Sequence, residues 1–290
     1  MKKSVLFIIN PISGGKKKLD FPALAKAQLD LDILDPEFVY TEWPTHANDL
    51  ALEAVERGKD IVVAVGGDGT INEVASALEG TRVVMGIIPF GSGNGLARAL
   101  NISLNNKRAL SIINNLKTRQ IDSAVLNDRK FFNMAGLGFD AHISLKFAKL
   151  KNRGLKGYIS TALSEISSYS SDLYDLTIDG NHFKIDAFMI SIANSCQYGN
   201  NAYISPEAKL DDGLLDICVI KPFPLSALPV IGFHLFNKTI HKTKYVEIIK
   251  GKDIRINRKK EGTVHLDGEP LEMAKEVSVK VKPLSLTVLN

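Results

Sequence analysis

The segment IVVAVGGDGTINEVASAL, residues 61–78, most constrains the fold of this chain. Its five leading apolar residues lack polar alternation, which is typical of a strand in a parallel sheet that is covered on both faces. Two glycines, an aspartate, a third glycine and a threonine follow, and then a pattern with helical periodicity. A tight strand-to-helix turn needs about one glycine, so this loop predicts that something approaches its backbone closely.

The first ~120 residues repeat this alternation. The predicted strands are SVLFII, EFVYTEWP, IVVAV and RVVMGIIP, and the predicted helices include HANDLALEAVERG, INEVASALEG and NGLARAL. Such alternation predicts an α/β domain with a parallel sheet, which we place at residues 1–122.

After about residue 122 the pattern changes to short strand-like runs. These runs are KFFNMAG, LYDLTID, HFKIDAFMISIAN, LLDICVI, YVEIIKG, DIRINR, TVHLDGEP and VSVKVK. Turn signals at Asp179-Gly180, Asp212-Gly213 and Asp267-Gly268 separate several of them, and a helical stretch over about 143–168 interrupts the series. Residues 123–290 are therefore predicted to form a mostly antiparallel β domain, and a return of the last strand to the first domain stays open.

The composition indicates an ordinary globular protein but does not determine its function. Hydrophobic residues make up 45% and charged residues 23% of the chain, as in ordinary globular proteins. The net charge of +4 permits an anionic partner, such as a membrane surface or a nucleotide, but does not require one.

The apolar and cysteine-containing segments match no secretory, membrane-spanning or metal-binding pattern. MKKSVLFIIN stops at Asn10-Pro11, so it is interpreted as a buried strand and not as a secretory signal. LSALPVIGFHLF, the longest apolar window, is shorter than the roughly 20 residues that span a bilayer. Cys196 and Cys218 match no zinc or CxxC spacing, and a reduced cytosolic setting fits them best.

Three glycine-rich loops, each following a predicted strand, are candidates for binding phosphate. They cover Asn10–Gly15, Gly66–Asn72 and Pro89–Gly95. Ligands of parallel sheets bind outside the carboxyl ends of the strands, where glycine-rich backbone and helix N-termini attract anions. Each loop alone could equally be a simple turn, and none matches GxxxxGK[ST] or the dinucleotide fingerprint. Asp68 either caps its own helix together with Thr70, or holds a cation or its water beside the phosphates.

The motifs GGDGTINEV and IPFGSGNGLARAL resemble the catalytic domain of the soluble diacylglycerol kinase and lipid kinase superfamily, which includes bacterial diacylglycerol kinases, sphingosine kinases and ceramide kinases. The resemblance extends in the expected order through NPISG, FNMAGLGFDAHI, SPEAKLDDGLLDI and HLDGEP, over nearly the whole chain. It implies an α/β domain related to NAD kinase and phosphofructokinase, a C-terminal β-sandwich, and ATP in the cleft between them.

The resemblance also assigns roles to individual residues. For magnesium it implies Asp212 with the backbone carbonyls of Lys209 and Leu214, and for proton acceptance it implies Glu269 with the neighbouring carboxylate of Asp267. From the residues alone, Asp212-Gly213 is better explained as a hairpin turn, and Asp267-Gly268 can likewise be a turn between strands. The nucleotide contacts implied by the resemblance are Asn10, Pro11, Ser13, Gly14, Thr41, Gly66, Gly67, Asp68, Gly69, Thr70, Asn72 and Ser92.

The chain departs from many bacterial diacylglycerol kinases at Asn94-Gly95, where they have asparagine-aspartate. GSGNGLA is closer to the loop of sphingosine kinases, so the identity of the acceptor lipid stays open. We expect an ATP- and Mg²⁺-dependent kinase that phosphorylates diacylglycerol, with a sphingoid base or ceramide-type lipid as the second choice. The alternatives are an NAD kinase-like enzyme with a soluble substrate and a non-catalytic binding protein.

A lipid kinase of this kind would work in the cytoplasm, at the inner membrane surface. The run LKFAKLKNRGLKGY carries Lys146, Lys149, Lys151, Arg153 and Lys156 without an acid, and either contacts anionic lipid or forms the solvated face of a core-packed helix. No nucleic-acid partner is expected, because the chain has one tryptophan and no known nucleic-acid module. A homodimer stays open.

Overall fold

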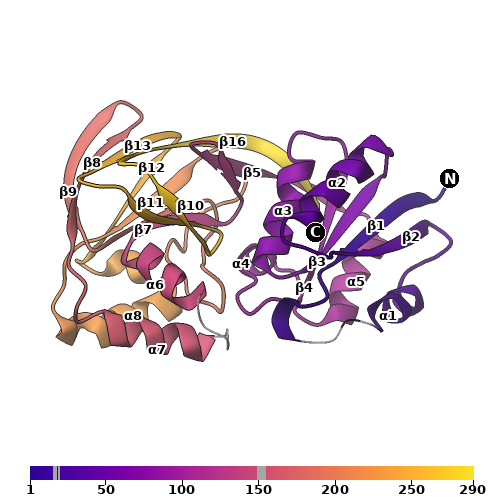
Figure 1. Ribbon diagram of the computed structural model, residues 1–290, viewed down its shortest axis with the longest axis horizontal. Helices are drawn as coiled ribbons and strands as arrows, with labels where there is room; N and C mark the ends of the chain where they lie inside the picture. Colours follow the sequence, from indigo (N-terminus) through magenta and orange to yellow (C-terminus); the bar gives the residue numbers. More distant parts are fainter. Residues whose placement is uncertain (16–17, 19, 149–154) are drawn as a thin grey trace. The chain divides into compact units, whose positions relative to one another are not determined.

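A computed structural model describes residues 1–15, 18, 20–148 and 155–290. The chain forms two compact units, residues 1–121 together with 284–290, and residues 122–283 (Figure 1). We call them unit 1 and unit 2. Two strands, β5 (Thr118–Leu126) and β16 (Glu276–Leu289), carry the chain from one unit to the other.

Unit 1 contains a parallel sheet with the strand order β2-β1-β3-β4. The chain leaves β1 toward one side of the sheet and returns from β2 to the other side, so the strand order reverses between β1 and β3. Such a reversal is the usual position of a ligand crevice in open α/β sheets. The strands are β1 (Lys3–Ile9), β2 (Leu34–Tyr40), β3 (Ile61–Gly66) and β4 (Val84–Pro89), and the end of β16 adds Val288 opposite Met85 of β4.

Helices cover both faces of this sheet (Figure 1). Helices α2 and α3 pack together on one face, against β1 and β3, and α1 and α5 pack together on the other, with α5 against β4. All five residues Ile61–Val65 of β3 are consequently buried, as their unbroken apolar run predicts. The helices are α1 (Phe21–Gln28), α2 (His46–Glu56), α3 (Asp68–Leu78), α4 (Gly95–Ala99) and α5 (Asn106–Asn115), with the 3-10 turn η1 (Ser13–Gly15).

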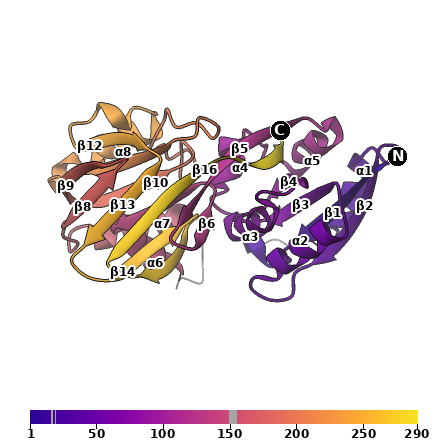
Figure 2. The ribbon, with the colours of Figure 1, turned by 90° about the horizontal axis from the view of Figure 1, so that it is seen from above.

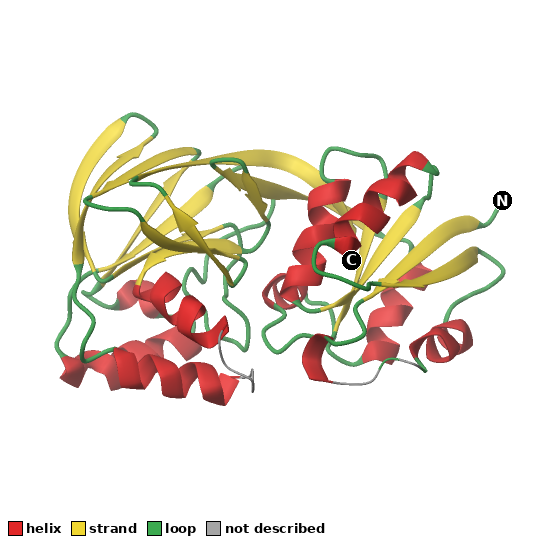
Figure 3. Cartoon of the chain, viewed as in Figure 1, coloured by secondary structure: helices red, strands yellow, loops and turns green. Residues whose placement is uncertain are grey.

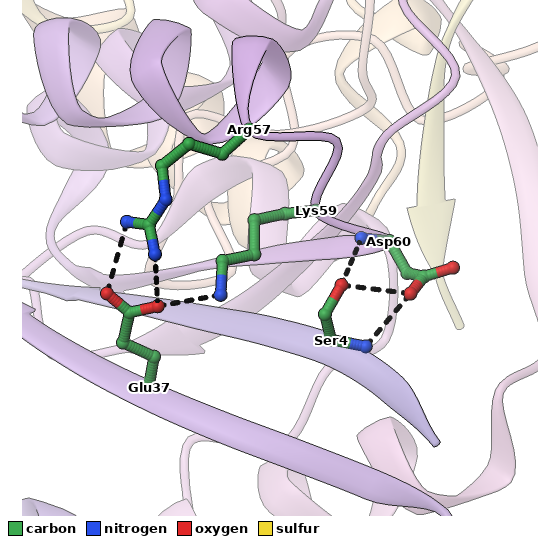
Figure 4. Close-up of polar contacts among 5 residues, drawn as sticks. All are labelled: Ser4, Glu37, Arg57, Lys59 and Asp60. Carbon is green, nitrogen blue, oxygen red and sulfur yellow. Dashed lines mark hydrogen bonds and ion pairs between the residues drawn. The ribbon is translucent and has the colours of Figure 1, made fainter. Parts of the chain in front are cut away.

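A polar cluster ties the strands of unit 1 together (Figure 4). The Asp60 carboxylate, just before β3, accepts hydrogen bonds from the backbone N–H and hydroxyl of Ser4 in β1, each at 2.9 Å. Lys3 and the Ser4 bonds lower the pKa of Asp60 to about 2. Glu37 of β2 accepts two hydrogen bonds from the Arg57 guanidinium and one from Lys59. The Ser4–Asp60 bonds thus tie β1 to the residue before β3, and the Glu37 bonds tie β2 to the segment between α2 and β3.

Unit 2 is built on two antiparallel sheets whose inner faces form one apolar core. Residues at alternate positions, such as Leu137, Ile190, Ile217 and Val264, point into this core. The first sheet contains β6 (Arg129–Phe131), β8 (Asp172–Ile178), β9 (Asn181–Ala187) and β13 (Asp253–Arg258) with parts of β5 and β16. The second sheet contains β7 (Met134–Gly138), β10 (Met189–Ala193), β11 (Leu215–Ile220), β12 (Val246–Gly251), β14 (Gly262–Leu266) and β15 (Glu269–Met273).

A layer of helices covers the outer face of the second sheet (Figure 3). The intervening residues, including Met134, Met189 and Cys218, meet Phe139 and Ile143 from the helices in a second apolar cluster. This layer contains α6 (Phe139–Ala148), α7 (Leu155–Glu165) and α8 (Leu228–Phe236), with the 3-10 turns η2 (Leu225–Ala227) and η3 (Ile240–Lys242). Figure 2 shows the same elements from above.

The predicted fold class is confirmed: an α/β domain with a parallel sheet is followed by an antiparallel β domain. Several element boundaries differ. The second strand begins at Leu34 and contains Pro36, which is tolerated because β2 is an edge strand. The helical stretch predicted over 143–168 starts earlier, at Phe139, and residues 149–154 within it lie outside the described residues.

Two helices of the structure were not predicted from the sequence. Helix α5 begins at Asn106, where the side chain of Asn105 accepts hydrogen bonds from the backbone of Lys107 and Arg108. Helix α8 forms within the apolar window LSALPVIGFHLF, and Pro229 lies in its first turn, where no backbone donor is needed. No helix in the described residues has both the length and the apolarity to cross a bilayer.

Candidate active site

The three glycine-rich loops meet at one edge of the unit 1 sheet, as predicted. Strands β1, β3 and β4 are parallel, with Ile9 opposite Val65 and Gly66 opposite Pro89, so the strands end level with one another. The loops that follow them therefore begin side by side, next to the reversal of strand order between β1 and β3.

Glycines allow these loops to contact one another directly. A Cβ atom on Gly14, whose φ is +66°, would lie 1.8 Å from the carbonyl oxygen of Phe90 in the third loop. A Cβ atom on Gly91 would lie 2.8 Å from the Cα atom of Gly67 in the second loop. The close approach that the glycines predicted is thus in part the approach of one loop to another.

Asp68 joins the second loop to the third. Its carboxylate accepts hydrogen bonds from the backbone N–H groups of Asn94, at 2.9 Å, and Gly95, at 2.8 Å. These are the first amides of α4, so Asp68 caps that helix. The expectation that Asp68 caps its own helix with Thr70 was wrong, because the N-cap of α3 is Gly67 and makes no side-chain hydrogen bond.

Other predicted nucleotide contacts lie in or next to the same loops. Asn10 donates a 2.9 Å hydrogen bond from its side-chain amide to the hydroxyl of Thr70, which connects the ends of β1 and β3. Thr41 directly follows β2 and donates its backbone N–H to Ile9. The hydroxyl-bearing Ser92 is exposed. Pro11, Ser13, Gly66, Gly69 and Asn72 complete the predicted set on the first two loops and the start of α3.

The KLDDGL segment forms a tight loop before β11 in unit 2. The carboxylate of Asp212 accepts a hydrogen bond from the backbone N–H of Leu214 at 3.1 Å and is exposed. Asp122, which the sequence analysis did not single out, accepts the N–H of Gly213 at 2.7 Å and donates its own N–H to Leu210 at 2.6 Å. Asp212-Gly213 thus lies at the end of the long connection, residues 194–214, between the paired strands β10 and β11, and is not a two-residue hairpin turn.

The chemistry of this loop suits a hard divalent cation. An exposed carboxylate from Asp212 and the backbone carbonyls of Lys209 and Leu214 are all oxygen donors, as Mg²⁺ prefers, and Mg²⁺ usually keeps several waters. Within the described residues, no three His, Cys, Asp or Glu side chains gather as a metal centre. A cation here would thus depend on the carbonyls and on water as well as on Asp212.

The second predicted pair of acids lies on the β14–β15 hairpin. Asp267 and Gly268 form its two-residue turn, with φ values of +49° and +91°. The Asp267 carboxylate accepts hydrogen bonds from the backbone N–H groups of Phe132, Asn133 and Met134, at 2.9 to 3.0 Å. It therefore anchors the hairpin to the segment between β6 and β7.

Glu269 differs from Asp267 in its surroundings. It is the first residue of β15 and is exposed. No donor among the described side chains and backbone amides lies within hydrogen-bond distance of its carboxylate. Of the two acids predicted as catalytic, Glu269 is the one whose carboxylate is available to a ligand.

A buried ion pair lies directly behind this hairpin, and sequence reasoning missed it. His265 of β14 contacts Asp140 of α6 at 2.8 Å, and both side chains are only 3% exposed. A Cβ atom on Gly136 would lie 2.3 Å from the His265 ring nitrogen, so glycine is required beside the pair. Tyr158 donates a 3.2 Å hydrogen bond to Asp140, as does Ser191 at 3.3 Å.

The two charges of this pair stabilise each other. Burial alone would raise the pKa of Asp140 and lower that of His265. Burial is the largest single influence on each pKa, but the facing opposite charge and the hydrogen bonds together outweigh it. The pKa of Asp140 is therefore below its ordinary value and that of His265 above its ordinary value. Burial and the Asp140 charge raise the pKa of Tyr158, which stays a neutral donor.

Comparison with known proteins matches both units. Residues 4–126 match the family model described as diacylglycerol kinase catalytic domain, and residues 133–290 the one described as YegS C-terminal NAD kinase beta sandwich-like domain. A relative from Pseudomonas putida named "Probable lipid kinase YegS-like" is 31% identical over 83% of this chain and 80% of its own. A relative of the same name from Serratia proteamaculans is 34% identical over 76% of this chain and 73% of its own.

Solved structures share the fold. A crystal structure titled as a diacylglycerol kinase from Bacillus anthracis has a TM-score of 0.76 at 21% identity, covering 99% of this chain and 96% of its own. An NAD kinase from Archaeoglobus fulgidus in complex with ATP has a TM-score of 0.54 at 14% identity, covering 100% of this chain and 94% of its own.

The contact between Gly14 and Phe90 predicts an unusually costly substitution. Gly14→Ala should lower the free energy of unfolding of unit 1 by clearly more than Gly58→Ala. Gly58 has nearly the same φ, +67°, but nothing lies within 4 Å of its Cβ position, so that variant pays only the backbone cost of about 1–2 kcal/mol. Urea unfolding followed by the fluorescence of Trp43 measures both variants. Equal losses would contradict the contact between the loops.

The buried pair predicts a pH-dependent stability of unit 2. The pKa of His265 in the folded protein is raised above its ordinary 6.5. The charged pair therefore contributes fully to the free energy of unfolding below pH 6.5, and this contribution is lost as pH rises through the folded pKa. His265→Gln should lower the free energy of unfolding by about 3–5 kcal/mol near pH 6.5, because Asp140 loses its partner. The difference in free energy of unfolding between the wild type and His265→Gln should become smaller at higher pH, because the wild type then loses the same interaction.

Labelling of the buried Cys218 thiol during urea unfolding, in a Cys196→Ser background, follows unit 2 separately from Trp43. The matched control is His234→Gln, because His234 is only partly buried and hydrogen-bonds Thr239 instead of an acid. A deficit for His265→Gln that is the same at every pH would contradict a charged pair.

Proposed function

Because the chain belongs to the YegS-like family of lipid kinases with a diacylglycerol kinase catalytic domain, we propose that it transfers the γ-phosphate of ATP to the hydroxyl of diacylglycerol, giving phosphatidic acid. The resemblance expected from the sequence motifs is confirmed at the level of the family and of lipid kinase activity. The nucleotide, the metal and the acceptor lipid are the parts that we propose.

The convergence of three glycine-rich loops at the carboxyl edge of the unit 1 sheet carries the proposal for ATP. Their backbone amides and the N-terminus of the 11-residue helix α3 favour an anion at this edge. Asn10, Thr70 and the exposed Ser92 hydroxyl supply hydrogen-bonding groups there. Related architecture in an NAD kinase that was crystallised with ATP agrees with a nucleotide at such a site.

Glu269 is the residue that we propose as the proton acceptor. Its free, exposed carboxylate takes the proton of the lipid hydroxyl while that oxygen forms a bond to the γ-phosphorus and the bond between the γ-phosphorus and the β–γ bridging oxygen of ATP breaks. The products are ADP and a phosphate ester. Asp267, with its carboxylate occupied by three backbone amides, acts by holding the turn that carries Glu269.

Magnesium is proposed at the KLDDGL loop, held by Asp212 and the backbone carbonyls of Lys209 and Leu214. When bound, the ion neutralises phosphate charge, which is a main requirement of phosphoryl transfer. Asp122 contributes by holding the Gly213 amide, and with it the shape of the loop.

Diacylglycerol is preferred as the acceptor because the family model over residues 4–126 is described by that activity. The glycine at position 95 resembles sphingosine kinases more than many bacterial diacylglycerol kinases, which keeps a sphingoid base or ceramide-type lipid as the second acceptor. The enzyme would meet either lipid at the cytoplasmic surface of the membrane.

An acceptor panel tests the substrate assignment. With radiolabelled ATP and Mg²⁺, vesicles that carry diacylglycerol should give labelled phosphatidic acid. Vesicles with monoacylglycerol, ceramide or sphinganine, and NAD in solution, should give much less product. Chelation of divalent cations should abolish transfer. A phosphorylated sphingoid base as the main product, or labelled product from NAD alone, would replace the proposed acceptor.

The role of Glu269 has a matched control on the same hairpin. Glu269→Gln should lower kcat by about 10²–10⁴-fold, because it removes the general base. ATP affinity, measured by calorimetry, should change little, since the proposed nucleotide contacts are on unit 1. Glu272→Gln alters an exposed acid of the same strand that bonds Thr263, and should retain activity. Near-normal turnover by Glu269→Gln would exclude it as the base.

A further inference from the structure

Helix α8 exposes an apolar surface although it belongs to a packed helical layer. Val230, Phe233 and Phe236 are 51%, 63% and 45% exposed, and Leu225 of the adjoining η2 is 53% exposed. Ile231, on the opposite side of the helix, is buried in the apolar cluster under the second sheet. The inner face of α8 is therefore already packed, and its outer face carries two exposed phenylalanines. We call the residues Leu225, Val230, Phe233 and Phe236 the α8 patch.

The segment that contains the α8 patch carries formal charges of one sign only. Residues 217–246 contain no Asp or Glu, but they contain Lys221, Lys238, Lys242 and Lys244. Lys221 is paired with Glu247 at 2.8 Å. Lys242 and Lys244 are exposed, and no carboxylate of the described residues lies within ion-pair distance of either. An apolar surface beside unpaired lysines is complementary to an anionic lipid surface.

A groove of about 420 Å³ joins the apolar and basic parts. Val230 of the patch lines it on the α8 side, and Lys242 and Lys244 line it on the η3 side. Polar hydrogen-bonding groups complete the wall, so a lipid phosphate could contact lysine while acyl chains meet the phenylalanines. These additional lining residues are Ser226, His234 and Tyr245.

We propose that the α8 patch, with Lys242 and Lys244, is the surface by which this protein binds an anionic bilayer. Phe233 and Phe236 enter the boundary between headgroups and acyl chains, and the two lysines contact lipid phosphates. This inference rests on the proposed function in one respect, because a diacylglycerol acceptor resides in a bilayer. The proposed membrane contact lies at α8 and not at the basic run that the sequence suggested. Of that run, Lys149, Lys151, Arg153 and the side chain of Lys156 lie outside the described residues.

Direct insertion can be measured by fluorescence, because Trp43 is the sole tryptophan of the chain. In a Trp43→Phe background, Phe233→Trp should shift its emission to shorter wavelength with phosphatidylglycerol/phosphatidylcholine vesicles and not with pure phosphatidylcholine. Leu104→Trp in the same background is the control, since Leu104 is a 43% exposed residue of unit 1. An equal shift at Leu104, or no shift at Phe233, would overturn the proposal.

Vesicle flotation without ATP or diacylglycerol tests the two parts of the surface separately. Phe233→Ser/Phe236→Ser should weaken binding at least tenfold. Lys242→Gln/Lys244→Gln should weaken it roughly 30-fold at low salt, about fivefold per lysine, and remove the preference for anionic lipid. The matched control Leu52→Ser/Leu104→Ser removes exposed apolar residues of unit 1 and should bind as wild type.

Three outcomes of this experiment would overturn the proposal: unchanged flotation of both variants, equal losses in the control, or a change of oligomeric state in the phenylalanine variant with intact flotation. The last would assign the α8 patch to a second copy of the chain. Phosphorylation of a water-soluble short-chain diacylglycerol distinguishes the two proposals, because the α8 variants should retain it. Its absence in the wild type would refute the proposed function and leave the flotation result standing.

Discussion

The level ends of β1, β3 and β4 are the constraint on which the nucleotide side of this protein depends. Parallel pairing of buried apolar strands fixes where each strand ends, and hence where each glycine-rich loop begins. The loops approach so closely that a single Cβ atom at Gly14 or Gly91 would collide with backbone atoms of a neighbouring loop. Glycine is therefore required at these positions by the packing of the loops before any ligand is considered, and the surface that we propose for phosphate binding is a consequence of that packing.

The acids in and around the motifs divide into those that hold backbone amides and those whose carboxylates remain available. Asp68 accepts the first amides of α4, Asp122 accepts the amide of Gly213, and Asp267 accepts three consecutive amides between β6 and β7. In each case the carboxylate and its amide donors are far apart in the sequence. Asp212, on the loop before β11, and Glu269, at the start of β15, are exposed beside segments that are held in this way. The carboxylates that hold backbone are thus different from the two that we propose for the chemistry. Such a division suits phosphoryl transfer, because that reaction needs mainly placement and charge neutralisation.

Much of the fold was readable from the sequence because its strongest signals are local. The run IVVAV, the turn at Asp179-Gly180 and the glycine-rich loops each depend on a few adjacent residues. What the sequence could not give depends on distant pairing. HFKIDAFMISIAN looks like one strand, but Phe188 separates β9 and β10, which belong to different sheets. The Asp140–His265 pair joins residues 125 positions apart, and no local sequence pattern around either residue predicts the pairing.

The departure at Asn94-Gly95 shows how the structure changes the meaning of a sequence difference. The family resemblance leads one to expect an aspartate at position 95, where this chain has glycine and therefore no side chain. The structure shows that this position acts through its backbone: the N–H of Gly95, together with that of Asn94, donates to Asp68, and any residue except proline supplies that group. The link between the second and third loops is therefore independent of the side chain at position 95. The departure removes one negative charge from the edge that would bind phosphates, and it preserves the geometry of that edge.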